Sequence, residues 1–157
     1  MVEKQRRPRG LLDTSVVIDL ELLSPENLPV ELAVSAITMA ELATGPEAAP
    51  DPQERARRIA LIQRADDTFD QLPFDLSAAR VYGRIYAAVI AARRKARGRR
   101  AMDLLIAATA LSNGLPLYTH NLGDFTGLEH LIEIIAVPPP SNPDEPDGVR
   151  ATGSAAE

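Results

Sequence analysis

Residues 11–19, LLDTSVVID, form the stretch that decides the fold class. Its first seven residues predict a short buried strand, with Asp13 near the carboxyl end. Thr14 or Ser15 can then cap a short helix that runs to about Leu22, because a hydroxyl at such a position accepts a hydrogen bond from a free backbone N–H. The stretch therefore predicts a strand that leads directly into a helix.

The same alternation of short apolar strands and helices continues along the chain. Glycine and proline mark the helix ends, as at Gly45-Pro46 and Gly114. Alternation of this kind favours an α/β fold with a short, mostly parallel central sheet flanked by helices on both faces. The further strands are expected at 32–36, 70–75, 117–119 and 131–137, and the further helices at 38–45, 52–69, 75–97 and 101–113.

The chain has 157 residues, which suits a single domain with one sizeable core. We expect a flexible lead-in at 1–9, a folded domain at 10–137 and a disordered tail, rich in proline and acid, at 138–157. The absence of cysteine excludes disulfides, thiolate zinc sites and a cysteine nucleophile. No apolar run approaches the ~20 residues of a membrane span, and the basic N-terminus lacks the apolar stretch of a signal peptide. We therefore expect a cytoplasmic protein with no membrane partner.

Four acidic residues stand in or beside apolar phrases. Ionised carboxylates are seldom buried without a partner, because the loss of hydration costs several kcal/mol, and the sequence offers no obvious cation beside any of the four. A divalent metal ion is the simplest shared partner, since Mg²⁺ and Mn²⁺ prefer oxygen ligands. Carboxylates that hold such an ion indicate phosphate chemistry. The acids are Asp13 in LLDTSVVID, Glu41 in ITMAELATG, Asp103 in MDLLIAATA and Asp124 in THNLGDF.

These acids fall where parallel sheets place their ligand sites. Asp13 and Asp124 lie near or just after predicted strand ends, and Glu41 and Asp103 fall in the first turns of predicted helices. Ligands of open α/β sheets bind at the carboxyl ends of the strands. We therefore expect the four carboxylates to converge on one rim, although they are far apart in the sequence.

Each acid also has a local explanation. Asp13 could cap a helix, and Asp124 could be a turn residue. Thr38 to Glu41 matches a capping box, in which the glutamate reaches back to a free amide. Asp103 in a first turn would be favoured by the helix dipole. These explanations account for the acids one at a time, and leave open why all four occur at such positions.

A basic run at 93–100, RRKARGRR, contrasts with the net charge of −5. It is either a solvated helix end or a surface that contacts phosphate or a protein partner. Its candidate contacts are Arg97, Arg99 and Arg100. His120, beside the last acidic phrase, either contacts substrate or is simply solvated.

Taken in order, the four phrases resemble those of PIN-domain proteins, and among them the VapC-type ribonuclease toxins of bacterial toxin–antitoxin pairs. The apolar strand leads into Asp13-Thr14-Ser15, and a Ser-x-x-Thr-x-x-Glu-Leu-x-x-Gly phrase follows at 35–45. Asp103 starts an Ile-Ala-Ala-type helix, and a Thr-x-Asn-x-x-Asp-Phe phrase closes the set at 119–125. The resemblance spans residues 11 to about 137 with the usual order and spacing.

The resemblance implies a PIN-like α/β catalytic domain that acts as a Mg²⁺-dependent endoribonuclease, with Mn²⁺ as the alternative ion. It also implies an RNA substrate, a homodimer, and a cognate antitoxin that inserts a segment near the active site. Some relatives carry an acid at the position of Asn121, which leaves Asn121 or Asp124 as the fourth ligand. The implied residues are the catalytic, metal-binding acids Asp13, Glu41, Asp103 and Asp124, and the polar supports Thr14, Ser15 and Asn121.

Two other functions stay open at this point. One is a PIN-like module that binds RNA or a protein without cleaving, although intact acids argue against it. The other is a metal-dependent DNA nuclease, because no residue pattern indicates recognition of the 2′-hydroxyl that separates RNA from DNA.

Overall fold

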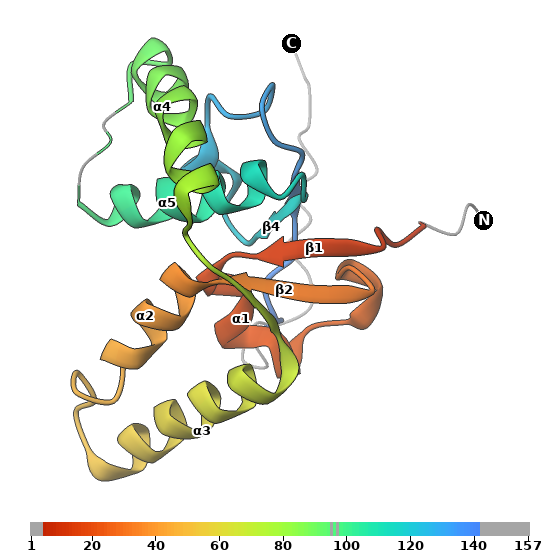
Figure 1. Cartoon of the computed structure of the whole chain (residues 1–157). Coiled ribbons are helices and arrows are strands. Elements are labelled where there is room, and N and C mark those ends of the chain that lie inside the picture. Colours follow the sequence, from red (N-terminus) through yellow and green to blue (C-terminus); the bar gives the residue numbers. More distant parts are fainter. Residues whose placement is uncertain (1–4, 95, 97, 142–157) are drawn as a thin grey trace, which may run out of the picture.

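Five parallel strands build the central sheet of the computed structural model, which describes residues 5–94, 96 and 98–141 (Figure 1). Their order is β3-β2-β1-β4-β5, and every neighbouring pair runs parallel. The predicted α/β class with a parallel sheet is therefore confirmed. The strands are β1 Arg9–Leu12, β2 Glu31–Ser35, β3 Asp70–Leu72, β4 Leu117–Thr119 and β5 Ile134–Ala136.

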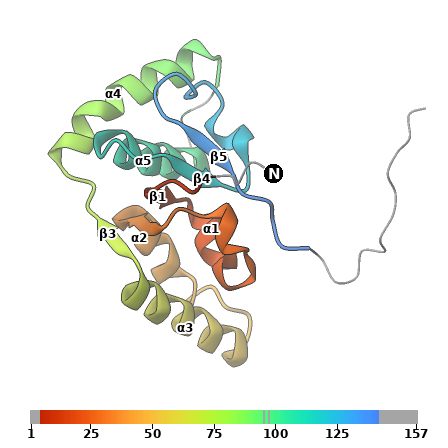
Figure 2. The same ribbon diagram turned by 90° about the vertical axis from the view of Figure 1, so that its right-hand side faces the viewer.

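Helices cover both faces of this sheet (Figures 1 and 2). α4 and α5 lie on one face and α1 and α3 on the other, while α2 leads away from the carboxyl end of β2. The helices are α1 Thr14–Asp19, α2 Ala36–Thr44, α3 Pro52–Thr68, α4 Leu76–Ala91 and α5 Arg99–Ser112. Short 3-10 turns occur at Leu20–Leu22 (η1), Pro25–Asn27 (η2) and Leu122–Phe125 (η3).

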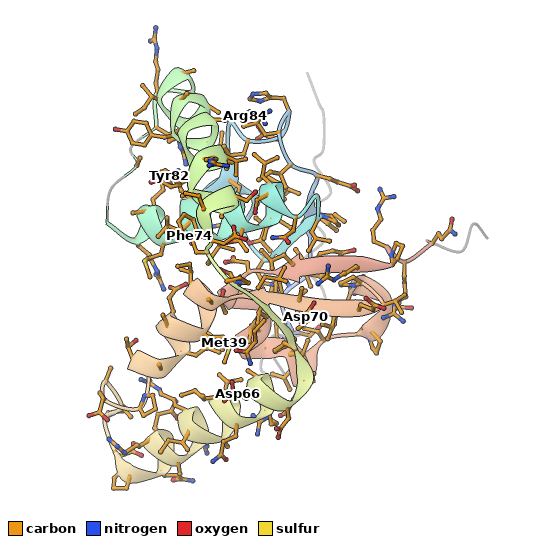
Figure 3. All side chains as sticks on the ribbon, viewed as in Figure 1. Met39, Asp66, Asp70, Phe74, Tyr82 and Arg84 are labelled. Atoms are coloured by element: carbon orange, nitrogen blue, oxygen red, sulfur yellow. The ribbon has the colours of Figure 1, made fainter. Side chains whose placement is uncertain are left out.

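The core consists of two apolar clusters, one on each face of the sheet. Successive side chains of a strand point to opposite faces, so Leu11 packs with Leu104 of α5 while Leu12 packs with Ala65 of α3. Met39 of α2 packs against the second cluster, between the sheet and α3 (Figure 3). Strands buried on both faces explain why the sequence shows continuous apolar runs at these positions.

Gly10 in the central strand β1 makes room for a large aromatic side chain of the neighbouring strand β4. A Cβ at this position would lie 2.4 Å from Cε2 of Tyr118 and 3.0 Å from Cγ of Pro29. The Tyr118 ring therefore lies directly over the backbone of β1, and it belongs to the same cluster as Leu12. A larger residue at Gly10 would displace the ring from this cluster.

Helix α1 begins earlier than predicted, because Asp13 is its cap. The Asp13 carboxylate accepts a hydrogen bond from the backbone N–H of Thr14 at 2.8 Å, and β1 ends at Leu12. The predicted strand to Val17 and the predicted cap at Thr14 or Ser15 are therefore wrong.

Helices α2 and α5 also begin early. Ser35 caps α2 by accepting a hydrogen bond from the N–H of Ile37 at 3.1 Å, so the predicted capping box between Thr38 and Glu41 does not form. Gly98 starts α5 from a left-handed conformation with φ of +64°. Asp103 consequently lies in the second turn of α5, and Glu41 in the second turn of α2, instead of in first turns.

Side chains of the segment before β1 contact the sheet region, and α4 is shorter than predicted. Arg6 donates hydrogen bonds to the carbonyls of Leu28 and Pro29 at 3.0 and 2.9 Å, and Arg7 pairs with Glu133. α4 ends at Ala91 instead of near residue 97. Most of the predicted tail, residues 142–157, lies outside the described residues. Across the described part of the chain, no helix is long and apolar enough to cross a membrane.

Candidate active site

The topology of the sheet creates a site between β1 and β4. From β1 the chain passes to β2 and β3 on one side, and then returns to β4 and β5 on the other. Such a switch point leaves a crevice at the carboxyl ends of the two neighbouring strands, which is where α/β sheets bind ligands. Asp13 follows β1 at this edge, and His120 and Asn121 follow β4.

Asp13 is the most firmly held of the four predicted acids. Its side chain is buried, and Oδ2 accepts hydrogen bonds from the hydroxyls of Thr119 at 2.9 Å and Ser15 at 3.0 Å. Oδ1 accepts from the backbone of Thr14. Burial raises the pKa of Asp13, and these hydrogen bonds act in the opposite direction. Three of its roughly four acceptor positions are in use, which leaves one on Oδ1 for a ligand.

Asp103 projects from α5 toward the same rim and is surrounded by like charges. Burial, together with repulsion from Asp13, Asp124 and Glu41, raises its pKa to about 7, while Arg99 acts to lower it. An electrostatic influence of all three acids on one carboxyl group requires that they lie close to it. Asp13, Asp124 and Glu41 therefore lie within electrostatic range of Asp103.

Glu41 reaches the site from α2. Its Oε1 accepts a hydrogen bond from the Thr14 hydroxyl at 2.8 Å, and Thr14 Oγ1 also lies 3.1 Å from Oγ1 of the buried Thr38. The side chain of Glu41 thus faces the acids instead of the amides of its own helix. This contact explains why a sequence that matches a capping box does not form one.

Asp124 is carried by the turn η3 after β4. The side chain of Asn121 caps this turn by accepting a hydrogen bond from Gly123 N at 3.0 Å, and Phe125 anchors it in the core. Arg94 donates to the Gly123 carbonyl at 3.1 Å from the end of α4. Oδ1 of Asn121 is thus engaged in the cap, whereas the charge of Asp124 acts on Asp103.

Two hydroxyl supports went unassigned in the sequence prediction. Thr119 is fully buried and donates to Asp13, and Thr38 is fully buried beside Thr14. Both residues stand in the phrases that carry the family resemblance, so the signal was present. The sequence alone, however, does not distinguish a buried threonine that supports a site from one that only packs in the core.

The acids are not arranged as a complete metal site in this structure. In the part of the chain that the structure describes, no three acidic or histidine side chains are arranged to hold a metal ion together. The donor chemistry is nevertheless that of a hard divalent cation, because the four acids and the hydroxyls beside them offer only oxygen atoms. The repulsion that raises the pKa of Asp103 is also the repulsion that a bound cation would remove.

The remaining candidate residues are the arginines of the basic run and His120, and they differ in exposure. Arg99 is exposed and lines a cavity together with Glu41, whereas Arg100 is partly buried one residue further along α5. Arg97 lies outside the described residues. The side chain of His120 is only 12% exposed, so the solvated alternative is wrong.

His120 connects three segments near the site. Its Nδ1 lies 2.8 Å from the carbonyl oxygen of Val137, and its Nε2 lies 3.2 Å from Oδ2 of Asp19. The backbone N–H of His120 donates to the Ser15 hydroxyl at 3.5 Å. The ring thus joins the end of β4 to the segment after β5 and lies beside the last residue of α1, where its buried Nε2 has no hydrogen-bond partner among the described residues.

A parallel sheet of order 3-2-1-4-5, with acids gathered at its switch point, defines a class of α/β domain with an acidic ligand site. The model of the PIN domain family matches residues 10–125, so the chain belongs to the PIN-domain family. The predicted resemblance to that family is confirmed.

Similar proteins of known name support the same assignment. Ribonuclease VapC5 of Mycobacterium tuberculosis (strain ATCC 25618 / H37Rv) is 37% identical over 133 residues, which cover 82% of this chain and 95% of that protein. Ribonuclease VapC of Rickettsia bellii (strain RML369-C) is 30% identical, with 82% and 96% covered. The crystal structure of VapBC-5 from Mycobacterium tuberculosis, a member of the VapBC family of toxin–antitoxin systems, matches with a TM-score of 0.72 and 37% identity over 83% of this chain and 99% of that chain. The predicted resemblance to VapC-type proteins is confirmed as well.

Proposed function

We propose that this chain is an endoribonuclease that hydrolyses RNA phosphodiester bonds and acts as the toxin of a type II toxin–antitoxin pair. One observation carries the proposal: acids from four separated segments act on one another, since burial of Asp103 together with repulsion from the other three raises its pKa to about 7. Relatives named ribonuclease VapC support RNA as the substrate. The presence of all four acids argues against the non-cleaving alternative, and the names of the relatives argue against the DNA-cleaving one.

A divalent metal, Mg²⁺ or Mn²⁺, completes the proposed site. Asp13, Glu41, Asp103 and Asp124 would hold it, because they supply oxygen ligands and an excess of negative charge. When bound, the ion supplies Lewis-acid polarisation of the scissile phosphate. Glu41, Asp103 and Asp124 would have to move toward Asp13, whose position the hydroxyls of Thr119 and Ser15 already hold.

The polar supports have separate roles in this proposal. Thr14 orients the Glu41 carboxylate, and Ser15 orients that of Asp13. Asn121 uses its side-chain oxygen in the cap of η3, which leaves its amide NH₂ group to donate to a phosphate oxygen. Arg99, at the edge of the site, would bind a phosphate of the substrate or an acidic partner segment.

The proposed partners are a cognate antitoxin and a second copy of this chain. Solved toxin–antitoxin complexes such as VapBC-5 support the antitoxin. Tyr86 and Ile90 are 47% and 49% exposed at successive turns of α4, which suits contact with another copy. Light scattering of the purified chain tests the dimer, and co-expression with the neighbouring reading frame tests the antitoxin.

The decisive experiment compares RNA cleavage by the parent chain with that by Asp13→Asn and Asp103→Asn. We expect both variants to lose at least about 100-fold in rate in Mg²⁺, because the site then lacks a charged ligand. Asp67→Asn is the matched control, since Asp67 is an exposed acid of α3 outside the site. Cleavage by Asp13→Asn at the parental rate would refute this site.

A further inference from the structure

His120 lies at the carboxyl edge of the sheet, between two residues that support the acidic site. Thr119, which precedes it, donates a hydrogen bond to Asp13. Asn121, which follows it, caps the turn that carries Asp124. The ring of His120 is nearly buried, and its nitrogen atoms face the segment after β5 and the end of α1 instead of the acids. Any role of this ring in the site is therefore indirect.

The hydrogen-bond ladder between β4 and β5 predicts which group should bond to the chain just after β5. The N–H of Leu117 donates to the carbonyl of Glu133 at 2.9 Å. The N–H of Val137 donates to the carbonyl of Thr119 at 2.8 Å. The bonds of a parallel pair are evenly spaced along the two strands. The next donor on the side of β4 is therefore the N–H of Asn121, and its acceptor would be the carbonyl of Val137.

A different bond takes the place of this next one. The N–H of Asn121 donates to the side-chain oxygen Oγ1 of Thr119 at 3.1 Å. The chain after Val137 continues with three prolines, which have no N–H to extend the ladder. Val137 itself is buried, so its carbonyl would be costly to leave without a donor. The end of β5 therefore needs a donor from outside the backbone ladder.

The ring of His120 supplies this donor. Its Nδ1 lies 2.8 Å from the carbonyl oxygen of Val137, and since a carbonyl only accepts, Nδ1 carries a proton and donates it. Nε2 faces Oδ2 of Asp19 at 3.2 Å, but these two atoms do not form a hydrogen bond. Among the described residues, the Val137 carbonyl is therefore the firm polar anchor of the ring.

The N–H of Asn121 in turn sets the direction of the Thr119 hydroxyl. A hydroxyl has one proton to donate and two lone pairs that accept. Because Oγ1 of Thr119 accepts the N–H of Asn121, its own proton points to the remaining partner, Oδ2 of Asp13, at 2.9 Å. The hydroxyl that holds Asp13 is thus itself held by a backbone N–H that the ladder would otherwise use.

We propose that His120 is a positioning residue of the active site: its imidazole takes the Val137 carbonyl and so leaves the N–H of Asn121 to orient Thr119 toward Asp13. Without this donor, the N–H of Asn121 would return to the ladder, and the Thr119 hydroxyl would lose its alignment. The kinetic consequence rests on the proposed function, and it adds to that site a residue that acts through Thr119 without touching the acids.

The same displacement would reach the far side of the site. Oδ1 of Asn121 accepts from Gly123 N at 3.0 Å, so the backbone of Asn121 and the turn η3 move together. Asp124 lies in this turn. One ring outside the acidic cluster therefore controls the position of Asp13 through Thr119 and that of Asp124 through η3.

The first test compares two replacements of His120 in RNA cleavage with Mg²⁺. His120→Leu keeps a bulky side chain but removes both nitrogen atoms. We expect its kcat to fall about 5–20-fold with KM within about twofold, because alignment of the acids is lost and the surface that binds substrate is not. His120→Asn should recover kcat to within about threefold of the parent, since its amide NH₂ group can donate to Val137 from nearly the position of Nδ1.

Two control variants separate positioning from loss of stability. His130→Leu removes an exposed histidine and should leave kcat and KM unchanged. Leu28→Ala truncates a buried side chain before the amino end of β2, on the edge of the sheet away from the acids. It should lower the thermal midpoint without lowering kcat at temperatures where the chain stays folded. An equal fall of kcat in Leu28→Ala and His120→Leu would assign the effect to stability and overturn the inference.

A double-mutant cycle tests whether His120 acts through Thr119. Thr119→Val removes the hydroxyl and should lower kcat at least as much as His120→Leu does. Adding His120→Leu to Thr119→Val should then cost less than about twofold more, because the hydroxyl that the ring orients is already absent. Losses that multiply in the double variant would mean that His120 acts by another route, and the inference would fail.

A measurement without RNA keeps this inference separate from the proposed function. In NMR spectra of the isotopically labelled, metal-free chain, His120→Leu should shift the amide signals of Asn121 and of Thr14, whose N–H donates to Asp13. His120→Asn should return both signals toward their parental positions. Unchanged signals in His120→Leu would overturn the inference. If the parent chain does not cleave RNA, the proposed function fails, and the amide signals still decide whether His120 sets the hydrogen bond of Asn121.

Discussion

Asp13 and Asp103 show two ways in which one site accommodates a carboxylate that is removed from water by burial. Asp13 is buried, but two hydroxyls and one backbone N–H bond its oxygens and offset much of the lost hydration. Asp103 has three acids as neighbours, and its pKa of about 7 records both burial and repulsion. Asp13 is therefore the fixed point of the site, and Asp103 is the group whose charge depends on pH.

The first prediction concerns the stability of Asp103→Asn without metal. The pKa of Asp103 is about 7 in the folded chain, against 3.8 for an unperturbed aspartate, so the unfolded chain loses this proton first as pH rises. Asp103 therefore lowers the free energy of unfolding progressively between about pH 4 and pH 7. The shift corresponds to at most about 4 kcal/mol, and solvent screening of this partly buried group reduces it to about 1–2 kcal/mol.

We expect Asp103→Asn to be more stable than the parent by about 1–2 kcal/mol at pH 8 in EDTA, and the gain to shrink toward pH 4. Urea unfolding followed by circular dichroism at both pH values measures it. Asp67→Asn should show no such pH-dependent gain. A gain of equal size at pH 4 and pH 8 would mean that the effect does not come from the charge of Asp103.

Residue identities were more predictable than residue roles. The sequence singled out all four acids, because each stands in an apolar phrase at an element boundary. The capping box, which the sequence offered only as a local explanation for Glu41, does not form, since the choice of Ser35 over Thr38 as cap depends on where β2 ends. The sequence prediction also missed Thr119, whose hydroxyl acts across a distance of 106 residues on Asp13.

At the scale of elements, the turn η3 depends on its packing against the end of α4. Gly127 has φ of +96°, and a Cβ there would lie 2.8 Å from Cβ of Ala92. The Gly123 carbonyl accepts the hydrogen bond from Arg94. The position of Asp124 is therefore set jointly by the turn and by a helix on one face of the sheet.

The second prediction follows for Arg94→Ala. Loss of its hydrogen bond should loosen η3 and misplace Asp124, which we expect to lower kcat for RNA cleavage about 5–20-fold with little change in KM. The thermal midpoint should fall by no more than about 2 °C, because the bond is exposed. Arg84→Ala, within α4, is the control. An unchanged kcat, or a KM effect alone, would show that Arg94 does not position Asp124.

Element types were predictable here, and boundaries were not. Apolar runs and the Gly-Pro signals placed every main helix and strand in order. The first residues of three helices were predicted wrongly, and in each case a single residue caps the helix. The caps are Asp13 for α1, Ser35 for α2 and Gly98 for α5. For α1 and α2 the cap forms where the preceding strand presents that residue at the sheet edge, and this is decided by tertiary pairing.

At the scale of the molecule, the parallel sheet could be predicted, but the strand order could not. Alternating strands and helices are compatible with several orders, and the order 3-2-1-4-5 follows from which apolar faces pack together. That order is what brings Asp13 next to the end of β4. Convergence of the acids on one rim was therefore a sequence hypothesis that only the topology could support.

The last prediction concerns the response of the whole fold to metal. In the apo chain the four acids repel one another, and no three of those described are arranged to hold an ion, so binding has to draw α2, α5 and η3 toward Asp13. A ligand that binds only the folded state stabilises it by about 2.7 kcal/mol at 100 times its Kd.

We expect saturating Mg²⁺ or Mn²⁺ at pH 8 to raise the thermal midpoint of the parent by about 5 °C relative to NaCl of equal ionic strength. The rise should be smaller at pH 5.5, where Asp103 is protonated, and smaller still in Asp103→Asn, whose metal-free midpoint is already higher. Because Asp13→Asn keeps the repulsion among the other three acids but lacks the fixed ligand, it should also lose the metal response. Differential scanning fluorimetry of the three proteins at both pH values measures these midpoints, and an equal rise in all three would place the metal outside this site.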